Sequence, residues 1–170
     1  MQGPADNYSV SGSLSIPITA TPTLGSAHNS ANVIPTSISQ TLTITIPPVL
    51  GAEGHNGTIV DAMVGEETSF PIDLANTGNN MTSYRLVLNH QIPAGWEVSF
   101  SASSIMPSTT VTDLPADVSN YGDNNTTHVT TFPLVLTTDP DAPANSIEYI
   151  GIDVFEMVSN VYITTFEVPV

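Results

Sequence analysis

Apolar and polar residues alternate strictly along two segments near the N-terminus. From Asn7 to Ala20 the even positions are apolar or small, and the odd positions are polar apart from Pro17. The alternation returns from Ser37 to Ile46, where isoleucine or leucine occupies positions 38, 42, 44 and 46 and the odd positions carry serine or threonine. Successive side chains of a β-strand point to opposite faces, so both segments are predicted to be long strands with one face to bury.

The rest of the chain has the pattern of short strands separated by turns. Proline, glycine, serine and asparagine are concentrated between 21 and 35, which indicates a linker. No later stretch of adequate length keeps a helical period of 3.6 residues, whereas turn signals recur at short intervals. The predicted strands after the first two are 58–63, 67–75, 82–90, 96–101, 128–137, 146–157 and 160–169.

This pattern predicts an all-β fold, namely an immunoglobulin-like antiparallel β-sandwich with an N-terminal β-strand arm. We place the arm at 1–20, the linker at 21–35 and the sandwich at 36–170. The 170 residues, 40 % of them hydrophobic, are enough to bury one full core. Residues 1–7 contain no apolar stretch, so we expect either a mature chain or one written without its export signal.

The charge inventory limits the partners. Sixteen residues are acidic, Arg85 is the single basic residue besides four histidines, and the formal net charge is −15. Such a charge repels nucleic acid and anionic lipid head groups. Because serine, threonine and asparagine replace most of the usual charged residues, the composition favours a cell-surface setting. No apolar run approaches the roughly 18 to 20 residues of a membrane-spanning helix.

Three motifs occur in a familiar order: Val64 to Asn79 (VGEETSFPIDLANTGN), Gln91 to Phe100 (QIPAGWEVSF) and Thr137 to Ala144 (TTDPDAPA). Together they resemble the NPCBM-associated and CARDB-like immunoglobulin domains of prokaryotic surface proteins, over roughly residues 58–170. The resemblance implies an immunoglobulin fold and an extracellular location, but no single activity. The segment 107–125 is longer than this resemblance leads us to expect, and the N-terminal arm lies outside it.

The candidate chemistry for catalysis is sparse. Cysteine and lysine are absent, so neither can act as a nucleophile, and no Gly-x-Ser-x-Gly motif marks a catalytic serine. The four histidines show no pairing at metal-binding spacing. A pair of carboxylates as in glycosidases is conceivable, but that chemistry needs a deep cleft. We therefore expect no enzyme. The single tryptophan, Trp96, is predicted to anchor the core, with carbohydrate stacking as the alternative.

Two kinds of small-ligand or modification site remain open. Calcium prefers carboxylate and carbonyl oxygens, which the segments around Asp123 and from Asp139 to Asp141 supply, although ordinary turn chemistry explains these residues equally well. We expect no cofactor, with calcium as the open alternative. Asn-x-Ser/Thr triplets begin at Asn7, Asn56, Asn80, Asn124 and Asn125, and all but Asn7 are kept as glycosylation candidates.

The amphipathic arm raises the question of what covers its apolar side. Edge strands of soluble sandwiches are usually blunted, most often by lysine, which this chain lacks. We predict that the arm inserts as a donor strand into the sandwich of a neighbouring copy, which would give a head-to-tail homopolymer. Folding back within the same chain is the alternative. The predicted donor-strand residues are Tyr8, Val10, Gly12, Leu14, Ile16 and Ile18.

In architecture and composition such a subunit resembles the donor-strand filaments of archaeal surfaces, for example threads and bundling pili. The expected function is therefore that of an extracellular filament subunit whose partner is itself, with glycans as further partners. Two alternatives stay open: a carbohydrate-binding or adhesion module of a larger secreted protein, and an S-layer or spacer domain.

Overall fold

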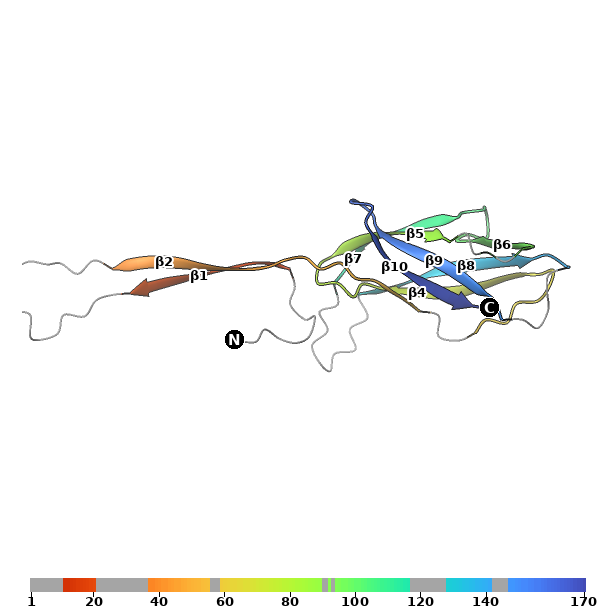
Figure 1. Cartoon of the computed structure of the whole chain (residues 1–170), viewed down its shortest axis with the longest axis horizontal. Coiled ribbons are helices and arrows are strands. Elements are labelled where there is room, and N and C mark those ends of the chain that lie inside the picture. Colours follow the sequence, from red (N-terminus) through yellow and green to blue (C-terminus); the bar gives the residue numbers. More distant parts are fainter. Residues whose placement is uncertain are drawn as a thin grey trace, which may run out of the picture. The chain divides into compact units, whose positions relative to one another are not determined.

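The computed structural model describes residues 11–20, 37–55, 59–89, 92, 94–116, 128–141 and 147–170 (Figure 1). These residues form ten β-strands, and within the described ranges no helix is long and apolar enough to cross a membrane. The chain divides into two compact units, one from Ser11 to Pro47 and one that begins at Pro48 and runs to the C-terminus. We call them the ribbon and the sandwich.

The ribbon consists of two antiparallel strands of nine residues each, β1 (Gly12–Ala20) and β2 (Ile38–Ile46). Its register places Leu14 opposite Ile44 and Ile16 opposite Leu42. Residues that face each other across an antiparallel pair point to the same side of the sheet, so the two alternating patterns coincide. One face is therefore built from aliphatic residues together with Gly12 and Gln40, and the other from serine, threonine and Pro17.

This pairing corrects the predicted domain boundaries. The N-terminal segment is not a lone strand, because β1 pairs with β2 of the same chain, and β2 is not a strand of the sandwich. The physical reason is the match of the two alternations, which lets the strands form backbone hydrogen bonds along their shared edge while keeping each face uniform. Tyr8 and Val10, predicted as part of the donor strand, lie outside the described residues.

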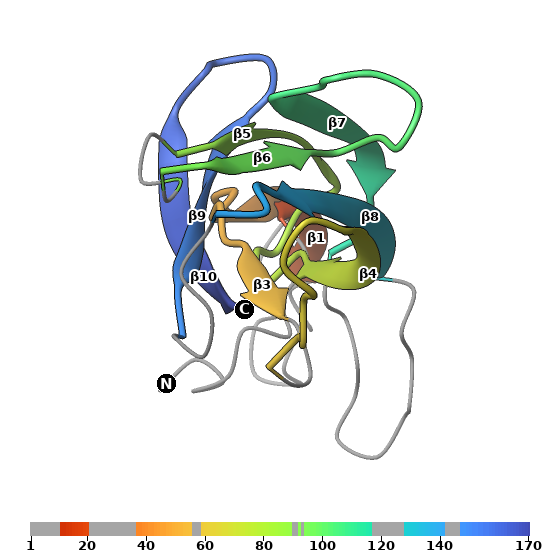
Figure 2. The ribbon, with the colours of Figure 1, turned by 90° about the vertical axis from the view of Figure 1, so that its right-hand side faces the viewer.

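The sandwich contains two antiparallel four-stranded sheets, ordered β3-β4-β8-β6 and β10-β9-β5-β7. Seen end-on, β9 and β10 lie across from β4 and β8 (Figure 2). The strands are β3 (Glu53–His55), β4 (Glu67–Ala75), β5 (Thr82–Leu88), β6 (Trp96–Ser99), β7 (Ser108–Leu114), β8 (Val129–Thr138), β9 (Tyr149–Glu156) and β10 (Tyr162–Pro169).

The predicted all-β antiparallel sandwich is thus confirmed. Immunoglobulin constant domains order their strands A-B-E-D in one sheet and C-F-G in the other. The same orders arise here when β3, β4, β8 and β6 are read as A, B, E and D, and β5, β9 and β10 as C, F and G. The additional strand β7 extends the second sheet beyond β5.

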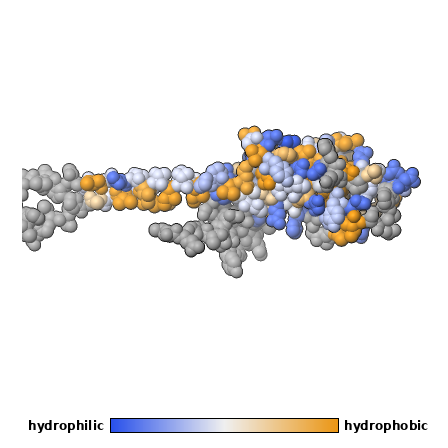
Figure 3. Space-filling model, viewed as in Figure 1, coloured by the Kyte–Doolittle hydropathy of each residue, from blue (hydrophilic) through white to orange (hydrophobic). Residues whose placement is uncertain are grey.

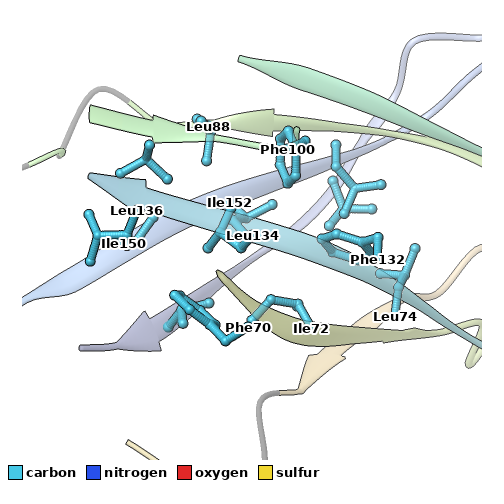
Figure 4. Close-up of a cluster of buried hydrophobic side chains, with 14 of the residues drawn as sticks. Phe70, Ile72, Leu74, Leu88, Phe100, Phe132, Leu134, Leu136, Ile150 and Ile152 are labelled. Atoms are coloured by element: carbon cyan, nitrogen blue, oxygen red, sulfur yellow. The ribbon is translucent and has the colours of Figure 1, made fainter. Parts of the chain in front are cut away.

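The core lies between the two sheets and follows from the period-two pattern of the strands (Figure 4). Strand β5 alternates strictly between buried and half-buried side chains, and β4 does so along its second half. Ile72, Leu134 and Ile152 are completely buried, and the rings of Phe100 and Phe132 meet edge to face at a centroid distance of 5.6 Å. Such burial is the main stabilising contribution to a sandwich.

The Asn-Thr-Gly-Asn turn between β4 and β5 holds the first segment of the sandwich in place. The Asn79 side chain accepts a hydrogen bond from the Val49 nitrogen at 2.7 Å, and the Asn79 nitrogen donates to the Val49 carbonyl at 3.1 Å. A Cβ on Gly78 would lie 2.4 Å from the same carbonyl oxygen, so only glycine fits there. The chain therefore enters the sandwich at a fixed point, beside the end of β4.

Candidate functional site

The apolar face of the ribbon is the most unusual surface of the described structure. Leu14 is 60 % exposed, Ile18 53 % and Ile38 67 %, and the remaining large aliphatic residues of this face are exposed as well. They form a continuous orange row along one side of the ribbon, whereas the other side is pale (Figure 3). Their exposed area is roughly 600 Å², at the upper end of the largest apolar patch on a typical soluble monomer.

The opposite face of the ribbon is suited to water. Hydroxyl groups pair across the strands, with Ser13 Oγ 3.4 Å from Thr45 Oγ1 and Thr19 Oγ1 3.2 Å from Ser39 Oγ. An isolated two-stranded sheet is marginally stable in water and gains stability when its hydrophobic face packs on another surface. The two faces together therefore indicate an element that is solvated on one side and covered on the other.

The ribbon is also free of formal charge. Between Asp6 and Glu53 the sequence contains no aspartate, glutamate, lysine or arginine, so fifteen of the sixteen acidic residues follow Ala52. Two copies with a net charge of −15 repel each other over most of their surface. The ribbon is the segment that approaches another copy with the smallest electrostatic penalty.

The edges of the sheet β3-β4-β8-β6 are protected by proline. Among the described residues, β3 pairs with residues 73–75 of β4 and β6 with 135–138 of β8, so the described strands leave part of each inner strand without a neighbour. The Asn76 nitrogen donates to the His128 carbonyl, and the Asp139 nitrogen donates to the Gly95 carbonyl. Because bonded and non-bonded pairs alternate along an antiparallel ladder, these bonds identify the residues whose backbone N–H and C=O groups point toward the edge of the sheet. Pro71 and Pro133 occupy outward positions in these uncovered stretches, where a missing N–H prevents strand addition.

Of the other candidates, Trp96 packs against the core while half-buried, and its Nε1 has no hydrogen-bond partner among the described residues. The glycosylation candidate Asn80 is exposed, and its backbone carbonyl accepts hydrogen bonds from the Asn76 amide and the Thr82 hydroxyl. The candidates Asn56, Asp123, Asn124 and Asn125 lie outside the described residues.

The calcium candidates Asp139 and Asp141 form an ordinary turn. Asp139 Oδ1 accepts a hydrogen bond from the Asp141 nitrogen at 2.9 Å, and both side chains are exposed. In the described part of the chain, no three histidine, aspartate or glutamate residues gather in a way that could hold a metal ion.

Among the described residues, an acidic hollow on the outer face of the sheet around β6 was considered as a catalytic site. Glu67 and Glu97 both lie opposite Thr137, one on each side, and serines of the turn after β6 complete the lining. Both glutamates are exposed. A carboxyl group that acts as a general acid at neutral pH needs an environment that keeps it protonated, typically burial. The hollow therefore carries no argument for catalysis.

No protein-family model matches this chain, and a search of curated proteins finds no match.

Proposed function

We propose that this protein is a structural subunit of an extracellular surface filament and that its N-terminal ribbon joins each subunit to the next. The single observation that carries the proposal is the exposed apolar face of an uncharged ribbon in a chain of net charge −15. The ribbon, rather than a lone N-terminal strand, is the element donated to the neighbour.

The size of this face is sufficient for a stable contact. Covering roughly 600 Å² of apolar surface contributes about 15 kcal/mol before opposing terms, at about 25 cal/mol per Å². The loss of translational and rotational freedom on association costs about 4 to 15 kcal/mol. Hydrogen bonds and the apolar area on the partner add to the favourable side, so a contact through the ribbon persists without disulfides or metals. This suits a chain without cysteine.

The polymeric form follows from the type of contact. A ribbon that binds a different surface on the next copy makes a heterologous contact, and such a contact propagates into an open fibre when its rotation does not close a ring. The extracellular location is supported by the low charge content, the abundance of serine, threonine and asparagine, and the resemblance to immunoglobulin domains of prokaryotic surface proteins.

The test compares substitutions on the two faces of the ribbon. Replacing the facing pair Ile16 and Leu42 by threonine removes apolar area while keeping residues that favour strands. The matched control changes the facing pair on the other side, Ser15→Thr with Thr43→Ser. We expect fibres by negative-stain microscopy and fast-sedimenting material for the unmodified chain and for the control, but monomers for Ile16→Thr/Leu42→Thr.

Assembly of the Ile16→Thr/Leu42→Thr variant to the same extent as the control would contradict the proposal. So would a monodisperse unmodified chain at a concentration of hundreds of micromolar. The fluorescence of the single tryptophan, Trp96, which packs against the core of the sandwich, shows for each variant whether loss of assembly reflects loss of folding.

A further inference from the structure

The four edge strands of the sandwich differ in how well they are protected. β3 has three residues, and β6 has four, carries Glu97 and is followed by a turn that folds back through a bond from the Phe100 nitrogen to Met106. β10 has a register shift near its start, and Glu167 and Pro169 occupy outward positions. These three edges therefore carry the devices that discourage strand addition, namely shortness, charge, irregularity and proline.

β7 carries none of these devices along most of its length. It has seven residues and pairs with β5 on one side, and among the described strands it is the last of its sheet. From Ser108 to Thr112 it contains only serine, threonine and valine, without charge and without proline. Asp113, with a φ of 53°, marks the irregularity that ends regular pairing, and its nitrogen donates to Ser83 Oγ at 2.9 Å.

The hydrogen-bond pattern shows which groups of β7 are free. The Leu88 nitrogen donates to the Pro107 carbonyl at 2.9 Å, in the register that continues through Val87 opposite Ser108. Hydrogen-bonded and non-hydrogen-bonded residue pairs alternate along an antiparallel ladder, so the backbone groups of Thr109 and Val111 bond to β5. Ser108 and Thr110 consequently direct their N–H and C=O groups outward, and within the described ranges no strand receives them.

Apolar side chains occur in the connection that precedes β7 and on the inner face of the strand. The connection from β6 to β7 carries Ile105, which is 70 % exposed, and Met106, which is 40 % exposed. On the strand itself, Val111 packs against the core. A strand added to β7 with its apolar side on the Val111 side of the sheet would extend this apolar surface.

From these observations we infer that the open edge of β7 accepts strand β2 from the ribbon of a neighbouring copy, an inference that rests on the proposed function. β2 is the suitable strand because it has no proline, whereas β1 contains Pro17. Both edges are uncharged, so the two copies meet where repulsion is smallest. The ribbon then extends the sheet β10-β9-β5-β7, with its apolar face on the Val111 side and its hydroxyl face on the side of the exposed Thr110.

The first test blocks the edge without touching the ribbon. Thr110→Pro removes an outward N–H that bonds to no described residue, so the sandwich keeps its internal ladder. We expect Thr110→Pro and Ile16→Thr/Leu42→Thr to be monomeric when alone. Mixed one to one, they are expected to form heterodimers, because one supplies an intact ribbon and the other an intact edge. Sedimentation velocity distinguishes these species, and thermal unfolding checks that Thr110→Pro is folded.

The second test uses the absence of cysteine from the chain. In the inferred arrangement Thr110 and the hydroxyl face of β2 point to the same side, so Thr110→Cys is expected to form a disulfide with Thr41→Cys or Thr43→Cys on a second copy. Thr131→Cys, exposed on the other sheet, is the control and is expected to remain unlinked. Assembly of Thr110→Pro to the unmodified extent, or cross-links between two ribbons only, would overturn the inference while leaving ribbon-mediated assembly intact. An unmodified chain that does not assemble would overturn both proposals.

Discussion

Tyr84 offers the sharpest test of how the sandwich holds its first segment. The side chain is completely buried, and its hydroxyl donates a hydrogen bond of 2.7 Å to the Gly51 carbonyl. In Tyr84→Phe this bond is lost, but the Gly51 carbonyl still accepts from the Thr77 nitrogen at 3.2 Å and is not orphaned. At pH 7 we therefore expect a free energy of unfolding that is lower by about 1 to 1.5 kcal/mol.

The effect of this substitution is expected to reverse at high pH. Burial, and to a lesser degree the nearby Glu156 carboxylate, raise the pKa of Tyr84 from 10.0 to about 12, although a bond with Thr82 opposes the shift. The neutral form is thus favoured in the folded state, so the contribution of Tyr84 is complete below pH 10 and is lost as the pH rises toward 12. At 1.36 kcal/mol per pKa unit the loss is about 1.4 kcal/mol at pH 11 and about 2 kcal/mol at pH 12. Phenylalanine does not titrate, so the two stability curves cross near pH 11.

The assay is urea unfolding followed by the fluorescence of Trp96, at several pH values from 7 to 11.5. Both proteins carry the Ile16→Thr/Leu42→Thr background, so that dissociation does not contribute to the transition. All other titrating groups are common to the two proteins, and the difference between them isolates Tyr84. A stability difference that stays constant across this range would refute the assignment of the raised pKa to Tyr84.

Of three further predictions, two concern buried contacts and the third concerns an exposed turn. Asn76→Ala removes side-chain bonds to the carbonyls of residues 80 and 114 and from the nitrogen of residue 78, so we expect a loss of about 3 kcal/mol in chemical denaturation; Asn80→Ala is the control and leaves stability nearly unchanged. Gly54→Ala places a Cβ 2.2 Å from the Phe166 ring, which is expected to cost about 1 to 3 kcal/mol, and a compensating Phe166→Leu is expected to recover part of it. Hydrogen bonds from the Ser159 hydroxyl, and to a lesser degree from backbone nitrogens, lower the pKa of Glu156. In Ser159→Ala we expect an NMR titration to show the pKa of Glu156 moving up toward its ordinary value. An unchanged titration would contradict this cause.

Much of the fold was predictable because period-two alternation is a local property of the chain. The strand segments 67–75 and 82–90 were placed to within about two residues, and the Asn-Thr-Gly-Asn turn between them was identified by residues that suit tight connections. The pattern does not predict β3, which has three residues, or β7, which has seven. Three residues carry too little pattern for β3, and the mixture of threonines with one valine in β7 has no clear apolar face.

The candidate site was predictable only in part. Alternation in the first 46 residues by itself determined that two amphipathic strands exist and that each has an apolar side to cover. It did not determine that the strands pair with each other, since the paired residues lie between 18 (Ala20 and Ile38) and 34 (Gly12 and Ile46) positions apart, and an apolar row is compatible with any sheet that offers the right register. The spatial pairing of the strands places the two apolar rows on one face, and it leaves β7 as the last of the described strands in its sheet. Both features arise from which strands become neighbours in space, a global choice that no local window of sequence contains.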